Sequence, residues 1–164
     1  SAYRAAIAAA LSRQVKAVDE NRALLAGLIQ DVGVLPVFMK LGEDQLNDLP
    51  LDDAMLALQE YSIKIGVVLA RKWQLDEALL AVIQNAGNYA YQGSDTLDLV
   101  DIANIARLLS QIGSQNIKWP NIDEAPCLRR FSQQGLSYEN SLELLKQARE
   151  DIHEIRQIIL SNLN

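Results

Sequence analysis

Apolar residues recur along the chain at the three- and four-residue spacing of amphipathic helices, without strand-like alternation longer than chance. The clearest segment spans about residues 51–73 and predicts a helix with one apolar face. That face contains Leu51, Met55, Leu58, Ser62, Ile65 and Leu69. A last helix is predicted over about 138–162, with a stripe of Leu145, Ala148, Ile152, Ile155 and Ile159.

Capping residues, glycines and prolines mark where the other helices begin and end. Asp19 and Asp76 each precede an apolar-periodic run and can accept hydrogen bonds from the first backbone N–H groups of a helix. Asp123 is a third candidate cap, and residues 43–50 form a polar connection. The helices are expected at about 2–17, 19–32, 36–42, 51–73, 76–86, 97–112, 123–134 and 138–162. This pattern predicts an all-α fold, a bundle of about seven or eight helices.

The net charge of −6 and the pI near 4.7 argue against nucleic acid as a partner, because binding to phosphates needs clustered Lys and Arg. No stretch approaches the ~20 apolar residues of a membrane span, so no membrane association is expected. The single cysteine, Cys127, is expected to be a small buried apolar residue and favours a cytoplasmic location. The start at Ser1 without Met suggests that upstream sequence is missing.

Three segments resemble the HDOD family, a relative of the HD phosphohydrolases. GLIQDVGVL at 27–35 resembles a GLLHDIGKL-type segment, and residues 61–87 are similar to the family pattern that includes Gly66 and Trp73. LVDIANIARLL at 99–109 resembles a later family helix. The resemblance implies an HD-domain-like fold, with residues 1–164 forming a single HDOD-like domain that lacks its N-terminal helices.

HD hydrolases hold one or two metal ions with His and Asp ligands, and the resemblance implies which positions would carry them here. These degenerate positions are Gln30, Asp31, Ser62, Ala86, Gly87 and Asn104. One carboxylate, Asp31, cannot assemble a divalent site. The resemblance therefore implies no catalytic residue, no bound metal and no cofactor. The sole histidine, His153, is expected on the solvent-facing side of the last helix.

Structural roles are expected for the residues at these positions. Asp31 is predicted to cap the following helix by accepting backbone N–H bonds near Val34 or Leu35. The Ser62 hydroxyl is predicted to bond back to the Leu58 carbonyl. Asn104 is predicted to be half buried, with a loop carbonyl as its partner. Trp73 is expected to close the core at the end of its helix. For Trp119, a place in the core and a place in a contact surface are both left open, with neither favoured.

The family resemblance implies a non-catalytic regulatory or protein-interaction module of bacterial signal transduction, with a protein of a signalling pathway as its partner. The alternative is an HD-type phosphohydrolase or nucleotide-binding protein with a modified pocket. A purely structural helical scaffold is a third interpretation. A homodimer formed through the stripe of the last helix is left open.

Overall fold

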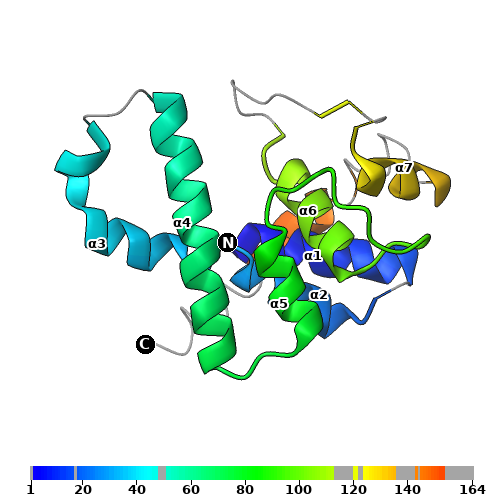
Figure 1. Ribbon diagram of the computed structural model, residues 1–164. Coiled ribbons are helices and arrows are strands. Elements are labelled where there is room, and N and C mark those ends of the chain that lie inside the picture. Colours follow the sequence, from blue (N-terminus) through cyan, green and yellow to red (C-terminus); the bar gives the residue numbers. More distant parts are fainter. Residues whose placement is uncertain are drawn as a thin grey trace. The chain divides into compact units, whose positions relative to one another are not determined.

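The computed structural model describes residues 2–16, 18–47, 51–112, 120–121, 124–135, 143 and 145–153. The regular elements of the described residues are all helices, without a strand, which confirms the all-α prediction (Figure 1). The helices are α1 (Ala2–Val15), α2 (Glu20–Ile29), α3 (Val34–Asn47), α4 (Leu51–Lys72), α5 (Glu77–Gln84), α6 (Leu99–Leu109) and α7 (Pro126–Gln133). Residues 145–153 are also helical and belong to the predicted last helix, whose remainder lies outside the described residues.

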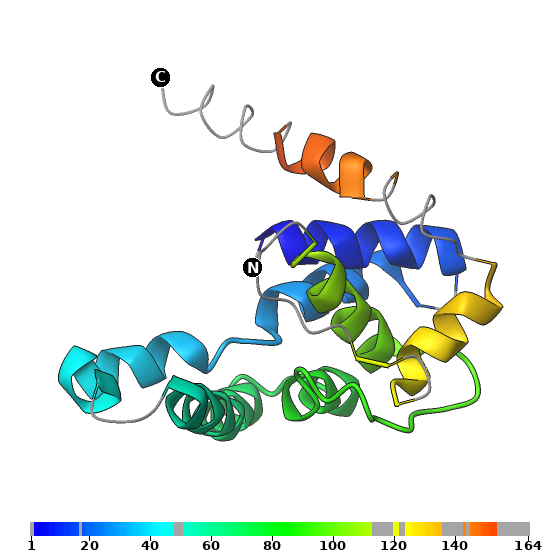
Figure 2. The same ribbon diagram turned by 90° about the horizontal axis from the view of Figure 1, so that it is seen from above.

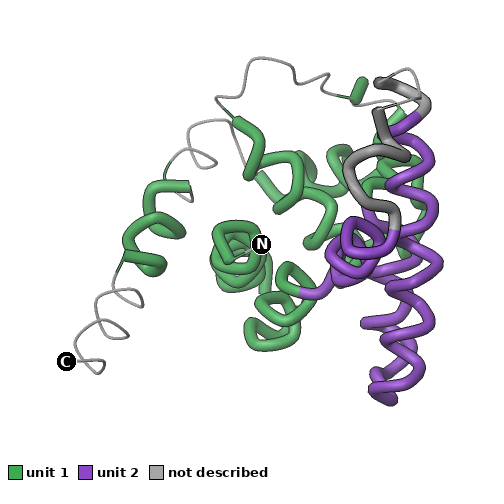
Figure 3. Tube along the Cα trace, turned by 90° about the vertical axis from the view of Figure 1, so that its left-hand side faces the viewer, with its two compact units in different colours: residues 1–28, 87–164 green, residues 29–86 purple. Residues whose placement is uncertain are grey.

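The chain divides into two compact units (Figure 3). Unit 1 comprises residues 1–28 and 87–164, and unit 2 comprises residues 29–86. Each unit has its own packed helices and is described by itself below. The single-domain interpretation of residues 1–164 stays a prediction.

Unit 1 is built around α1, in which eight consecutive residues from Ala5 to Ser12 are buried. A helix buried on all sides must be apolar all round, and the alanine-rich sequence supplies this. Figure 2 shows α1 between α6 and the helical residues 145–153. Small side chains let the neighbouring helices come close, since a Cβ on Gly27 of α2 would lie 2.5 Å from the Ala5 Cα.

Unit 2 is organised by α4, which packs against both α3 and α5. Its core contains Ala70, Leu80 and Ile83, with Ile29, Val32, Val67 and Leu75 packed around them. The buried line of α4 consists of small residues at four-residue spacing: Ala54, Ser62, Gly66 and Ala70, with Leu58 half-buried between the first two. These small residues allow close approach of the chain, because a Cβ on Gly33 would meet the Ser62 carbonyl oxygen at 1.9 Å.

Two predicted caps are confirmed. The Asp19 Oδ1 accepts a hydrogen bond from the Arg22 N–H at 3.0 Å, and the Asp76 Oδ1 accepts one from the Leu79 N–H at 3.0 Å. Asp123 lies outside the described residues, and α7 begins instead with Pro126 after Ala125 as its N-cap. A proline suits the first helical turn because its missing N–H would have no partner there.

Several predicted helix bounds are wrong, including the end of the sixth helix, which lies at Leu109 rather than Ile112. The second helix stops at Ile29 rather than Val32, because residues 30–33 form a turn. The third helix continues to Asn47, through Gly42 and most of the predicted 43–50 connection. Strong helix formers follow Gly42, and a single glycine costs a helix only about 1 kcal/mol.

Two predicted core residues are exposed. Met55 was expected on the buried face of its helix but is 62% exposed, because the buried line follows the small residues instead. Trp73 was expected to close the core but is 53% exposed. The chain reverses at Gln74, which adopts a left-handed φ of 56°, and Leu75 rather than Trp73 turns into the core of unit 2.

One described segment, Glu20–Lys40, is long and apolar enough to cross a membrane by length and composition, with a mean hydropathy of 1.5 over its window. The expectation that no stretch approaches this length was therefore wrong. The turn at residues 30–33 interrupts the helix within this segment, and a third of the window is buried in the protein. Such a segment is weak support for a membrane span.

Candidate functional site

The six degenerate positions fall in both units. Gln30, Asp31, Ser62 and Ala86 belong to unit 2, whereas Gly87 and Asn104 belong to unit 1. Four of them are buried, namely Gln30, Ser62, Ala86 and Asn104, while Asp31 and Gly87 are half-buried. The positions that the resemblance assigns to metal ligands are therefore largely withdrawn from solvent.

Asn104 and Gly87 are brought into direct contact. The Asn104 Oδ1 accepts a hydrogen bond from the Gly87 N–H at 2.9 Å, and its Nδ2 donates to the Asn88 carbonyl oxygen at 3.4 Å. The predicted loop carbonyl partner is thus confirmed, although Asn104 is fully rather than half buried, at 2% exposure. Both ends of the amide are used to hold the loop that follows α5.

The Ser62 hydroxyl behaves differently from the prediction. Its Oγ is buried without a hydrogen-bond partner, so the expected bond to the Leu58 carbonyl is not formed. Ser62 belongs to the turn of α4 against which Gly33 packs. The two backbones are so close there that a Cβ on Gly33 would lie 1.9 Å from the Ser62 carbonyl oxygen. For comparison, the Ser12 hydroxyl of α1 does donate back along its helix, to the Ala9 carbonyl oxygen at 2.8 Å.

Asp31 precedes α3 within the turn of residues 30–33. The Val34 N–H donates to the backbone carbonyl oxygen of Asp31 at 3.0 Å. This main-chain bond places Asp31 where the next helix starts. Capping by its side chain stays a prediction.

The residues at the six positions do not fit a divalent metal ion. They offer one carboxylate, two carboxamides and one hydroxyl, without an imidazole or a second anionic ligand. The Asn104 amide is already engaged by the main chain of Gly87 and Asn88. Among the described residues, no group of three His, Cys, Asp or Glu side chains could hold a metal ion. The sole histidine, His153, is exposed on the helical stretch 145–153 as predicted.

A buried ion pair in unit 1 was missed at the sequence level. The Arg130 guanidinium of α7 donates through Nε to Asp101 Oδ2 at 2.9 Å and through Nη2 to Asp101 Oδ1 at 2.7 Å. The two side chains are 11% and 1% exposed. Burial raises the pKa of the Asp101 carboxyl, and the hydrogen bonds from Arg130 oppose that shift.

The same carboxylate also belongs to the start of α6. Asp98 caps this helix and forms a capping box with Asp101, and the Tyr91 hydroxyl donates to Asp98 Oδ2 at 3.1 Å. The pKa of the Tyr91 hydroxyl is raised, mainly by burial and next by the negative charge of Asp98. The Asp98–Asp101 spacing is a capping signal in the sequence. Nothing local to the sequence pairs Asp101 with Arg130, which is 29 residues away.

Cys127 lies beside this network in α7 and is buried, as predicted. Burial first, and the charge of Asp101 second, raise the pKa of its thiol to about 11. Because the thiolate is the reactive form, Cys127 is a packing residue rather than a nucleophile.

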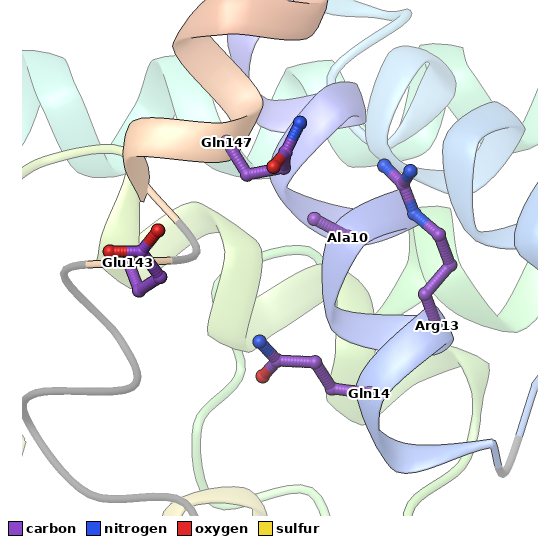
Figure 4. A pocket seen from close by; sticks show the side chains of 5 residues that line it. All are labelled: Ala10, Arg13, Gln14, Glu143 and Gln147. Atoms are coloured by element: carbon purple, nitrogen blue, oxygen red, sulfur yellow. The ribbon is translucent and has the colours of Figure 1, made fainter.

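A cleft of about 330 Å³ in unit 1 has none of the six degenerate positions in its lining (Figure 4). It is lined by Ala10, Arg13, Gln14, Glu143 and Gln147. The Arg13 guanidinium lies 2.8 Å from Asp151 Oδ2 and 3.5 Å from Glu20 Oε1. The cation is balanced by these two carboxylates, so the cleft offers little attraction for an anion. Trp119, the candidate interface residue, lies outside the described residues.

Comparison with a known crystal structure shows the class of fold to which this chain belongs. A crystal structure from Shewanella amazonensis SB2B, reported as a "putative metal-dependent phosphohydrolase", is similar to this chain with a TM-score of 0.64 at 17% sequence identity. The similarity covers 91% of this chain and 55% of that one, so the chain spans about half the length of that protein. The fold is therefore HD-domain-like and all-α.

The family follows from the sequence itself. The family model of the HDOD domain matches residues 1–89, and the chain belongs to the HDOD family. No match to the chain was found among curated proteins.

Proposed function

We propose that this chain is a non-catalytic regulatory module that acts by binding a protein partner in a cytoplasmic pathway of bacterial signal transduction. The family membership supports a relationship to HD-type proteins, and the degenerate positions support the loss of their chemistry. The observation that carries the proposal is the state of Asn104. At the position of the late metal ligand, its amide is consumed by two main-chain hydrogen bonds.

The chemistry of these bonds supports a structural role for this position. The Asn104 Oδ1 already accepts from the Gly87 N–H, so only its second lone pair is left for a cation. Breaking a buried hydrogen bond costs about 1–3 kcal/mol for each group left unsatisfied. A cation would have to offset that cost for both Gly87 and Asn88, and Asp31 is the one carboxylate among the six degenerate positions.

The second candidate is an HD-type phosphohydrolase or nucleotide-binding protein with a modified pocket. It is favoured by the likeness to the Shewanella structure, which is described by its name as metal-dependent. At 17% identity this likeness supports the fold alone. A fold does not determine an activity, which depends on the groups at the site.

The two candidates differ in metal content and turnover. The purified protein would be incubated with Mn²⁺, Fe²⁺, Ni²⁺ or Zn²⁺, passed through a desalting column and assayed for retained metal. Hydrolysis of p-nitrophenyl phosphate and of bis-p-nitrophenyl phosphate would be measured alongside an active HD phosphodiesterase as the positive control. We expect substoichiometric metal and no turnover above the metal-free buffer. Retained metal with turnover that Asp31→Asn abolishes would establish the hydrolase instead.

A further inference from the structure

The helical residues 145–153 of unit 1, called the 145–153 helix below, lie along α1 (Figure 2). Two residues three positions apart, Leu145 and Ala148, are buried, at 7% and 0% exposure. The other sides of the helix carry exposed polar residues, namely Lys146, Gln147, Arg149, Glu150 and His153. The helix is therefore amphipathic, and its apolar face is turned into unit 1.

An ion pair joins the 145–153 helix to α1. Arg13 Nη2 lies 2.8 Å from Asp151 Oδ2, and Gln147 Nε2 donates to Asp151 Oδ1 at 2.9 Å. The Arg13 and Asp151 side chains are 43% and 26% exposed, so solvent screens the pair. Arg13 Nε also lies 3.5 Å from Glu20 Oε1, at the start of α2. If the 145–153 helix left α1, Arg13 would therefore keep a carboxylate beside it.

The contact between the two helices is incomplete. The cleft of about 330 Å³ takes its lining from both, with Ala10, Arg13 and Gln14 on α1 and Glu143 and Gln147 on the other side (Figure 4). Ala10 and Arg13 stand three positions apart and share one face of α1. This face offers a small apolar side chain beside a cation, which suits a helix that carries an apolar stripe and an acid.

We infer that the face of α1 around Ala10 and Arg13 is the docking site for an acidic amphipathic helix of the protein partner, and that the 145–153 helix occupies this site in the same chain. The inference rests on the protein-binding role proposed above. The bound segment shows which chemistry the site accepts, because Leu145, Ala148 and Asp151 present a large apolar residue, a small residue and a carboxylate at three-residue spacing.

A partner helix with this spacing would make the same contacts, including the ion pair with Arg13. It can bind only to chains whose own helix has left α1. The apparent affinity is therefore reduced in proportion to the fraction of such chains. The 145–153 helix would thus regulate the site by competing for it.

A fluorescein-labelled peptide of residues 138–162 of this chain is the probe, and fluorescence anisotropy measures its binding to the whole chain. Ala148→Glu in the chain puts a charge at a fully buried position, which should displace the helix from α1. We expect this variant to bind the peptide roughly tenfold or more tightly than the wild-type chain does. The matched control is Lys146→Glu, at an exposed position of the same helix, which should leave the affinity unchanged.

Substitutions in the peptide test which residues make the contact. Asp151→Asn in the peptide should weaken its binding to the Ala148→Glu chain roughly two- to fivefold, as expected for an exposed ion pair. Glu150→Gln in the peptide removes a neighbouring charge on an exposed side of the helix and should have no effect.

Thiol labelling keeps the inference testable if circular dichroism shows that the Ala148→Glu chain does not fold. Ala148→Cys introduces a thiol that a reagent reaches only when the helix leaves unit 1, since Ala148 is fully buried. The buried Cys127 of α7 reports global unfolding in the same molecule. With both rates normalised to the urea-unfolded chain, we expect the Ala148→Cys thiol to react roughly tenfold or more faster than Cys127.

Equal normalised rates for the two thiols would overturn the inference. So would a folded Ala148→Glu chain that binds the peptide no more tightly than the wild type does. A dimer of that variant that takes up no peptide would assign the face to a second copy instead. None of these results alters the metal retention and turnover that test the proposed function, so the two can fail separately.

Discussion

A carboxamide at position 104 does something that a carboxylate could not do in the same place. It accepts from one main-chain group and donates to another, so the Gly87–Asn88 segment is tied to α6 from both sides of a single side chain. A carboxylate has acceptors only. The identity of this residue is therefore coupled to the conformation of the loop after α5.

Asn104→Asp should lower the free energy of unfolding by about 1–3 kcal/mol at neutral pH, because an ionised oxygen would face the Asn88 carbonyl. Burial should raise the pKa of the new carboxyl above its unfolded value. The folded state then binds the proton more tightly, so the deficit should shrink as the pH falls and the protonated acid can donate to Asn88. Urea unfolding at neutral and mildly acidic pH measures this. Asn21→Asp, at an exposed position of α2, is the control; an equal loss there would contradict the explanation.

Arg130 and Asp101 form a buried ion pair, so removing the arginine alone leaves the buried carboxylate of Asp101 without its partner. Arg130→Met should cost about 3–5 kcal/mol at neutral pH, since it leaves the buried Asp101 carboxylate uncompensated. Arg129→Met is the matched control on the exposed side of α7 and should lie within about 0.5 kcal/mol of the wild type.

The pH dependence of the same variant follows from the raised pKa of Asp101. An acid with a raised folded-state pKa contributes stability that is fully present below its unfolded pKa and is lost as the pH rises through the folded value. Removing Arg130 removes a group that opposes the shift, so the deficit of Arg130→Met should be smallest at acidic pH. A deficit independent of pH, in urea unfolding monitored by circular dichroism, would show that the ion pair is not its source.

At the scale of helices, the packing of unit 2 depends on small residues in α4 and on Gly33 beside it. A Cβ on Gly33 would meet main-chain atoms of α4, namely the Ser62 carbonyl oxygen at 1.9 Å and the Gly66 N at 2.6 Å. Backbone atoms cannot move aside as a flexible side chain can. Ser62 and Gly66 are therefore the part of α4 that the turn before α3 contacts most closely.

Gly33→Ala should lower the free energy of unfolding by about 2 kcal/mol or more, because overpacking against a backbone forces the elements apart. The control is Gly135→Ala, which has no neighbouring atom within 4 Å but a φ of +73°. Only the left-handed strain of about 1–2 kcal/mol applies at that position. Thermal and urea unfolding would compare the stabilities of the two variants. A Gly33→Ala protein as stable as the wild type would show that Gly33 does not pack this closely against α4.

At the scale of the whole molecule, the six degenerate positions are divided between unit 1 and unit 2, and metal binding would be detected as a change in stability. In a metalloprotein, a cation that binds only the folded state adds its binding free energy to the stability of the fold. Here the link that the structure shows at Asn104 is a pair of hydrogen bonds within unit 1.

We therefore expect the melting temperature to be the same with EDTA and with added Mn²⁺, Ni²⁺ or Zn²⁺. Differential scanning calorimetry of the intact chain measures this, with an HD phosphohydrolase that retains its His ligands as the control. A melting temperature that rises with metal concentration would indicate binding to the folded state and count against the proposed function.

The sequence by itself determined the helical class, the approximate helices and the caps at Asp19 and Asp76, because periodicity and capping act between residues a few positions apart. It also indicated the family and which ligand positions carry neutral residues. Only the tertiary structure decided that Asn104 closes on Gly87 and Asn88, that Arg130 pairs with Asp101, and that Met55 and Trp73 face solvent. Such contacts join residues from different elements, and the burial of a helical face depends on what packs against it.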